Sequence, residues 1–308
     1  MRKHEKLAYA YMLDEEKAVL EALEKVYERA LRDINERIKV LQADELLANR
    51  VYRKQAQEAL KGQVTAILER LHTQEYETIE EYLKGSYTDG FVSTVYSLHK
   101  QGLPLTFPID QAQVVKALMT NSAISEGLYK SLGVDTKHLR EVIAAEISRG
   151  IASSMSYAEI ARNVANQTGI AKNRARSIVI TESHRIQEEA SQDVRVEAKN
   201  KGANIVKQWD ATLDGKTRDT HRRLDGQIRE VDEPFEIDGK TAMYPGGFGV
   251  AEEDCNCRCV ALTRAKWGMN ESELETLKER AEYFGLDKTE SFEEFKRKFL
   301  DALEDDSK

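Results

Sequence analysis

Three cysteines and a histidine are the residues of this chain with the clearest potential for chemistry. The cysteines fall within five positions, Cys255, Cys257 and Cys259, in the run EDCNCRC. Thiolate sulfur and imidazole nitrogen are the ligands that zinc prefers in proteins. The sequence therefore makes His221, Cys257 and Cys259 the candidate ligands of a zinc ion, which would stabilise a lobe with few apolar residues.

The geometry of such a site depends on a local distortion of the backbone. Cysteines two positions apart on a regular strand have Cα atoms about 6.5 to 7 Å apart on the same face. A kink at Asn256 or Arg258 is needed to bring both sulfurs to one ion. Asp214 or Asp254 is a candidate for the fourth ligand, since one histidine and two cysteines leave a tetrahedron incomplete.

Two other interpretations of the cysteines stay open. Free cysteine is commonly buried and behaves as a small apolar side chain, so Cys257 and Cys259 are also candidates for ordinary core packing. A redox-active or nucleophilic thiol is the third interpretation, and it requires a lowered thiol pKa. An odd number of cysteines so close together excludes the disulfide framework of a secreted protein and favours a reducing compartment.

His221 also has an enzymatic interpretation. As a general base paired with Glu182 or Asp214, and with Arg218 or Arg222 binding a phosphate, it would serve a metal-dependent nuclease. The structural alternative has His221 hydrogen-bonding across the Asp-Gly turns that surround it. The sequence contains no GxxxxGK[ST] loop, no GxGxxG loop and no nucleophile elbow. These absences favour a protein without catalytic activity.

The candidate residues form an ordered series along the chain. It consists of a Trp at the end of a strand-like run, Asp-Gly, Thr-Arg, His, a second Asp-Gly and a terminal Cys-Arg-Cys. A helix with Arg followed by Thr-Glu precedes the series. The residues that define it are Arg176, Thr181, Glu182, Trp209, Asp214, Arg218, His221, Gly226 and Arg258.

Over about residues 150–262 this series resembles the signature of the Mu-F-like head-morphogenesis proteins of tailed bacteriophages, in the branch typified by a minor head protein of a Bacillus siphophage. The resemblance implies a non-enzymatic minor head protein, located in the virion near the portal and in the host cytoplasm during assembly. It implies the portal protein as a partner, with capsid or scaffold proteins as further candidates, and a role in procapsid assembly and in DNA packaging or ejection.

One departure from the family pattern concerns the metal. Many members carry His-Pro before Asn-Cys-Arg-Cys, whereas this chain has Asp254-Cys255 there. Some members also carry toxin domains, including ADP-ribosyltransferases. An ExE pattern at Glu75-Tyr76-Glu77 places its two carboxylates about 200° apart on a helix. About 40 residues follow the motif region, which we expect to be too few for such a domain.

Charge is distributed unevenly along the chain. The net charge is −8, but residues 172–229 contain 13 Lys or Arg and 9 Asp or Glu, a local balance of +4. This asymmetry is consistent with solvated mixed-charge faces or with one face that binds double-stranded DNA without sequence preference. Arg218, Arg222 and Arg223 are the candidate DNA contacts. No apolar run is long enough to predict a membrane span.

Residue patterns predict an α+β fold that is predominantly helical, with four regions. They are a helical N-terminal region (1–103), a helical connector (104–148), the Mu-F-like motif domain (149–265) and a helical tail (266–308). In the first region Leu20, Tyr27, Ile34 and Leu41 recur every seventh position, which predicts a helix packed lengthwise on a partner. That partner is either a second helix of a hairpin or bundle, or another protein.

Breaks and turns complete the prediction. Prolines within 102–108 end the N-terminal helices, and a helix follows through Ile143 and Ile147. Ser156 and Glu159 have capping-box spacing for a helix that Thr168-Gly169 ends, before another helix over 171–200. Strands are predicted at 205–209 and 257–263, with Asp-Gly turns between them.

Overall fold

The computed structural model describes residues 1–42, 50–105, 137–149, 155, 157–266, 289 and 291–305 of this chain. The fold class is α+β and predominantly α, as predicted, with long helices and two small antiparallel sheets. The chain forms two compact units, each built from separate segments. Unit 1 comprises residues 1–16, 82–120 and 180–308, and unit 2 comprises residues 17–81 and 121–179.

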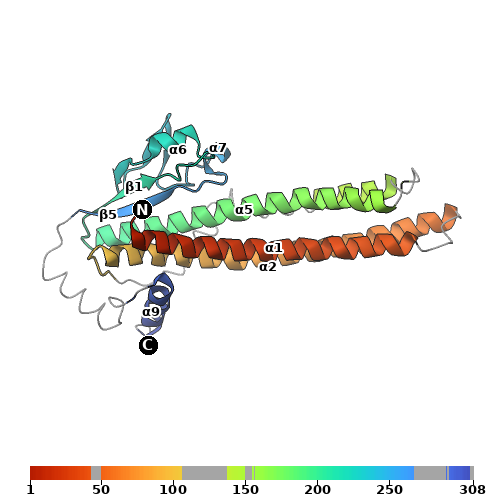
Figure 1. The fold of residues 1–308 in the computed structure, drawn as a ribbon, viewed down its shortest axis with the longest axis horizontal. Helices are drawn as coiled ribbons and strands as arrows, with labels where there is room; N and C mark the ends of the chain where they lie inside the picture. Colours follow the sequence, from red (N-terminus) through yellow and green to blue (C-terminus); the bar gives the residue numbers. More distant parts are fainter. Residues whose placement is uncertain are drawn as a thin grey trace. The chain divides into compact units, whose positions relative to one another are not determined.

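Helices α1 (Lys3–Gln42) and α2 (Arg50–Lys100) pair antiparallel in both units (Figure 1). In unit 2 the Tyr27 hydroxyl donates to Glu75 at 2.6 Å, and in unit 1 the Ser97 hydroxyl donates to Glu5 at 3.5 Å. Heptad positions such as Ile34 are buried within this pairing. The stripe therefore packs on the chain's own helices, which confirms the hairpin interpretation; the burial of Leu41 lies outside the described side chains.

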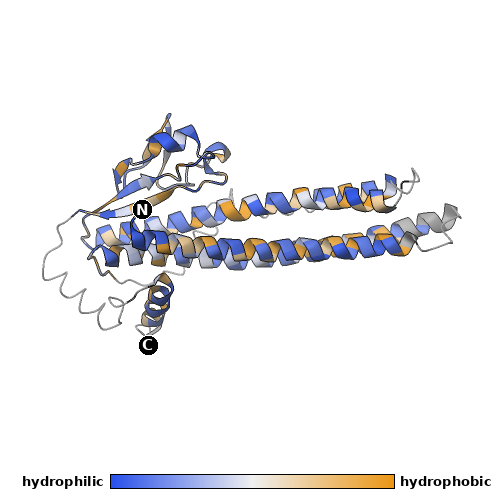
Figure 2. Cartoon of the chain, viewed as in Figure 1, coloured by the Kyte–Doolittle hydropathy of each residue, from blue (hydrophilic) through white to orange (hydrophobic). Residues whose placement is uncertain are grey.

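Apolar and polar positions alternate along these helices, as Figure 2 shows by the change of colour from turn to turn. This pattern gives each helix one apolar stripe that is buried and one polar face that contacts solvent. None of the helices that the structure describes combines the length and apolarity needed to cross a lipid bilayer.

Helix α5 (Tyr157–Asn200) is one continuous helix of 44 residues. The predicted end at Thr168-Gly169, and the separate helix from 171, are therefore wrong. The Thr168 hydroxyl donates to the carbonyl of Val164 at 2.9 Å, so it is satisfied inside the helix. Gly169 lowers helix propensity by only about 1 kcal/mol, which burial along 44 residues outweighs.

The helix predicted through Ile143 and Ile147 is confirmed, since residues 137–149 are helical and both side chains are buried. Helix α2 ends at Lys100, and Gly102 follows with φ of 84°. Pro108, the segment beginning at Asp110 and the cap at Ser156 lie outside the described residues.

The β-rich part of unit 1 contains two sheets. Strand β1 (Ile205–Asp210) lies between β2 (Ile228–Glu230) and β5 (Val260–Ala265) in an antiparallel sheet. The register places Trp209 opposite Ala261. Strands β3 (Phe235–Ile237) and β4 (Lys240–Ala242) form a hairpin. Its turn residues, Asp238 and Gly239, have φ of 51° and 76°, as a type I′ Asp-Gly turn requires.

Two short helices connect these strands and carry site residues. Helix α6 (Asp219–Leu224) buries His221, and α7 (Ala251–Asp254) leads into the cysteines. The predicted strand at 257–263 begins three residues later than expected, at Val260. Cys257 and Cys259 therefore lie in the segment without regular secondary structure that leads into the strand.

The described tail ends in α9 (Phe292–Asp305), which confirms a helix there. Its aromatic residues pack on α2, with the rings of Phe295 and Tyr96 4.9 Å apart. The four predicted regions, 1–103, 104–148, 149–265 and 266–308, stay a prediction, because each compact unit combines segments from several of them.

Candidate functional site

The imidazole of His221 and the sulfurs of Cys257 and Cys259 meet in the interior of the β-lobe. Nδ1 of His221 lies 3.3 Å from Sγ of Cys259 and 3.6 Å from Sγ of Cys257. All three candidate ligand atoms lie within 4.8 Å of one another, and all three residues are buried. The structure therefore brings together the three residues that the sequence identified as candidate metal ligands.

The backbone turns sharply at Asn256, directly before the two inner cysteines. Asn256 has φ of 52°, in the left-handed region that asparagine tolerates better than most residues. Its backbone N–H donates to the Thr181 hydroxyl of α5 at 3.0 Å. Cys255 is exposed, in contrast to its two neighbours. A kink thus occurs at the first of the two predicted positions, where it separates exposed Cys255 from buried Cys257.

A carboxylate lies on the other side of the His221 ring. Nε2 is 3.3 Å from Oε2 of Glu253, a residue of α7 that is also buried. Glu253 accepts hydrogen bonds from Thr220 at 2.8 Å and Lys240 at 2.9 Å. Burial raises the pKa of Glu253, but these donors outweigh burial and hold it below its usual value. Glu253 is therefore an anion that faces the imidazole.

Aromatic side chains surround the same ring. Trp209 is fully buried and meets His221 edge to face, with ring centroids 5.6 Å apart. Phe248 stacks on His221 at 6.3 Å, and Phe235 lies against Trp209 at 5.1 Å. The two inner cysteines belong to the same core cluster. This burial is also what the interpretation as packed side chains predicts.

The two inner thiols differ in acidity. A hydrogen bond from Cys257 and the nearby His221 imidazole lower the pKa of Cys259 to about 5, against the opposing effect of burial. The same contact with Cys259, together with burial, raises the pKa of Cys257 well above its usual value. The hydrogen bond between the two sulfurs therefore makes Cys259 the more acidic of the two thiols.

The aspartates proposed as fourth ligands have other partners. Both carboxylate oxygens of Asp214 accept hydrogen bonds from the Arg258 guanidinium, at 2.7 and 2.9 Å. The oxygens of Asp254 accept the backbone N–H groups of Phe248 and Gly249, at 3.1 and 2.7 Å. The candidate metal group among the described residues consists of His221 and the two inner cysteines without either aspartate.

The three candidate DNA contacts are engaged within the lobe. Arg218 donates to the backbone carbonyl of Cys255. Arg222 donates to the carbonyls of Thr217 and Asp214. Arg223 pairs with the carboxylate of Asp238 through both guanidinium nitrogens. Arg222 and Arg223 are nevertheless exposed.

The basic excess of residues 172–229 is only partly on the surface. Arg185, Arg195 and Lys207 are buried, as are Glu182 and Glu188. Ten Lys or Arg residues and seven Asp or Glu residues of this segment therefore remain partly or fully exposed to solvent. The excess of positive charge at the surface, ten minus seven or +3, is therefore smaller than the +4 counted from the sequence.

The other signature residues have structural contacts. In α5, the buried carboxylate of Glu182 pairs with Arg185 at 3.0 Å. Arg176 lies in the part of α5 that belongs to unit 2 and is half-buried. Gly226 has φ of 77° and donates its N–H to the carbonyl of Trp209 at 2.9 Å.

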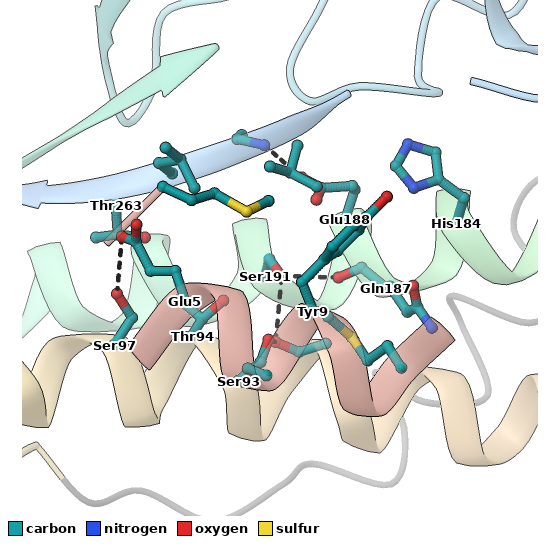
Figure 3. A pocket seen from close by; sticks show the side chains of 17 residues that line it. Glu5, Tyr9, Ser93, Thr94, Ser97, His184, Gln187, Glu188, Ser191 and Thr263 are labelled. Carbon is teal, nitrogen blue, oxygen red and sulfur yellow. Dashed lines mark hydrogen bonds between the residues drawn. The ribbon is translucent and has the colours of Figure 1, made fainter. Parts of the chain in front are cut away.

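A buried polar network on α5 was not predicted from the sequence. Glu188 accepts the N–H of Ala261 at 3.0 Å, and Arg195 donates to Thr263 at 3.0 Å. Burial raises the pKa of Glu188 to about 7, although Arg195 opposes it. Figure 3 shows Glu188 beside Tyr9 and His184 in the pocket beneath β5. Periodicity alone could not find this network, because its charged residues occupy positions that normally face water.

Comparison with known proteins defines the class of the chain. Residues 141–262 match the family model described as Phage Mu protein F like protein. Over these residues the chain is therefore similar to the Mu-F-like family.

Two curated relatives are each 33% identical to the chain. One is the NAD(+)--arginine ADP-ribosyltransferase EFV of Enterococcus faecalis (strain ATCC 700802 / V583), over 240 residues that cover 77% of this chain and 49% of that protein. The other is the minor head protein GP7 of Bacillus phage SPP1, over 186 residues that cover 60% of each chain. The chain thus spans about half to three fifths of the length of these relatives. No solved structure matches the chain.

Proposed function

We propose that this chain is a non-enzymatic minor head protein that binds at the portal vertex of a phage head and takes part in head assembly and in DNA packaging or ejection. The observation that supports it most directly is the 33% identity to a protein named as a minor head protein, over 60% of each chain. The partners of this role are the portal protein and, as further candidates, capsid or scaffold proteins.

The contacts of the signature residues are consistent with a structural role. Asp214 and Arg258 bind each other, while His221 faces the cysteines and Glu253. A nuclease that uses His221 as base and Asp214 as metal ligand needs both groups directed at one substrate. Here they are held by different partners, which favours the non-enzymatic proposal over the nuclease alternative.

Portal binding is tested with the full-length chain and the portal protein of the same genome, co-expressed and separated by gel filtration. We expect the chain to elute with the portal oligomer. Elution of both folded proteins as separate species would contradict the proposal.

A matched pair of double variants tests which unit docks. Val40 and Ile170 in unit 2 are 66% and 50% exposed, and Leu213 and Ile228 in unit 1 are 62% and 54% exposed. If the helices carry the contact, replacing the first pair with serine weakens co-elution and replacing the second pair does not. The reverse result would assign docking to the β-lobe.

A second candidate function follows from the relative named as an ADP-ribosyltransferase, since its alignment covers 77% of this chain. About half of that protein lies outside the alignment. Glu75, the first carboxylate of the ExE pattern, is buried and accepts a hydrogen bond from Tyr27. We expect the full chain to transfer no ADP-ribose from labelled NAD⁺ to agmatine; transfer above a no-protein blank would refute the non-enzymatic proposal.

A further inference from the structure

The donor atoms of His221, Cys257 and Cys259 have the spacing of a tetrahedral zinc site. With Zn–S near 2.3 Å and Zn–N near 2.05 Å, a sulfur and a nitrogen on one zinc ion lie about 3.5 Å apart. The two measured separations, 3.3 and 3.6 Å, bracket that value. We propose that Nδ1 of His221 and the sulfurs of Cys257 and Cys259 bind one zinc ion that stabilises the β-lobe.

The surroundings of His221 match those of a metal ligand. A histidine that binds a metal through one nitrogen usually directs the other toward a carboxylate, which fixes the tautomer and the ring orientation. Nε2 of His221 lies 3.3 Å from Oε2 of Glu253, within reach of such a contact, although the two groups are not aligned as a hydrogen bond. Glu253 is in turn paired with Lys240, at 2.9 Å. Packing alone does not require a buried, balanced carboxylate behind the imidazole.

Charge balance supports the same ion. When zinc binds, two Zn–S bonds form, and any proton still held by either sulfur leaves to solvent without any redox change. Two thiolates neutralise the divalent ion, so the buried site carries no net charge. Soft sulfur donors with an imidazole favour zinc over magnesium or calcium.

A bound metal would stabilise the small β-lobe, and a surface cleft gives solvent access to the ligand side. Strands β2, β3 and β4 have three residues each, and the lobe's core cluster is small. Zinc stabilises small domains of this kind because its binding free energy adds to folding. Cys257 lines a surface cleft together with Lys216, Arg218 and Arg258, which gives solvent access to the ligand side. In the part of the chain that the structure describes, three side chains offer ligand atoms to this site.

The test uses full-length chain without a histidine tag, grown with zinc and purified without chelator. Elemental analysis should find about one zinc per chain. Cys255→Ser is the matched control, because Cys255 is exposed and is not one of the three proposed ligands. This variant should keep the zinc. Cys257→Ser, Cys259→Ser and His221→Ala should each lower zinc affinity by more than about tenfold, since even the loss of an outer-shell partner lowers metal affinity by about 10- to 100-fold.

A second measurement does not depend on whether those variants fold. Wild-type protein freed of metal by a chelator is titrated with Co²⁺, which reports tetrahedral geometry by its visible bands and thiolate ligands by a charge-transfer band. Both signals are expected, with zinc displacing cobalt. Wild-type protein with no stoichiometric transition metal and no such spectrum overturns the proposal. A Cys257–Cys259 disulfide in freshly purified protein, detected by mass spectrometry, overturns it as well.

Discussion

Replacing Gly90 with alanine should destabilise unit 1, because α2 and α5 approach there too closely for a side chain. A Cβ atom at Gly90 would lie 2.2 Å from the carbonyl oxygen of Gln187, and 2.6 and 2.7 Å from its Cα and carbonyl carbon. These are backbone atoms of α5, which no rotamer change can move aside. The hydroxyl of Ser191 also donates to the Gly90 carbonyl at 3.1 Å (Figure 3).

The magnitude follows from two opposing effects. Alanine in place of glycine stabilises an unobstructed helix by about 0.5 to 1 kcal/mol. At Gly90 the overlap exceeds about 1 Å relative to ordinary contact, and overpacking of this kind costs about 1 to 3 kcal/mol or more. Separation of the helices also weakens the Ser191 bond, which contributes about 1 kcal/mol. The net result is a loss of about 1 to 3 kcal/mol in the free energy of unfolding.

Gly85 provides the matched control in the same helix and the same unit. A Cβ atom there meets nothing within 4 Å, so Gly85→Ala should stabilise by up to about 1 kcal/mol. The assay is urea unfolding followed by circular dichroism, with hydrogen exchange to locate the effect at Gln187. If Gly90→Ala proves as stable as Gly85→Ala, the close approach of the two helices is refuted.

Three further predictions concern the β-lobe. Burial lowers the pKa of Lys207 to about 7, below its unfolded value, so the protein should gain stability as pH rises above 7, where the unfolded chain binds more protons. Lys207→Met should lack this gain. Between about pH 7 and 9 the free energy of unfolding, followed by thermal unfolding, should rise by up to about 2 to 3 kcal/mol more in the wild type than in the variant; an equal rise in both would contradict the lowered pKa. The affinity for double-stranded DNA should fall as the salt concentration rises. Arg222→Ala should reduce the slope of log affinity against log salt concentration by about one. Arg223→Ala should change it less, because Asp238 already neutralises Arg223; slopes unaffected by Arg222→Ala in fluorescence anisotropy would exclude this contact. Asn256→Val should destabilise by about 1 to 2 kcal/mol, since a β-branched residue resists φ of 52°, and an unchanged melting temperature would argue against the kink.

Local patterns were sufficient to predict the parts of the fold that depend on neighbouring residues. The heptad repeat of α1 identified a buried stripe because helix periodicity sets which side chains share a face. Asp238-Gly239 identified a hairpin because the type I′ turn needs two residues that tolerate positive φ. Asn256 was likewise a candidate position for a kink, because asparagine tolerates positive φ, and it has φ of 52°.

Features that depend on distant residues were missed. Gly169 in isolation predicts a helix end, but it lies inside α5, whose burial outweighs the cost of one glycine. Glu188 and Arg195 have the residue types of solvated helix positions, yet β5 covers them and its backbone supplies their partners. Glu253 lies in a run of three acids, and nothing local distinguishes it from Glu252, which is exposed. Only the fold reveals which acid faces His221.

The signature residues come from distant parts of the sequence, and they contact one turn from several sides. Thr181 of α5 accepts the N–H of Asn256, and Arg218 donates to the carbonyl of Cys255. Arg258, on the other side of the kink, is held by Asp214. Each contact constrains a different residue of the turn that places both inner sulfurs beside His221. The ordered series that resembles the family signature therefore has a physical basis in the β-lobe, where helix, Asp-Gly loop and cysteine turn must all be present for the thiols and the imidazole to meet.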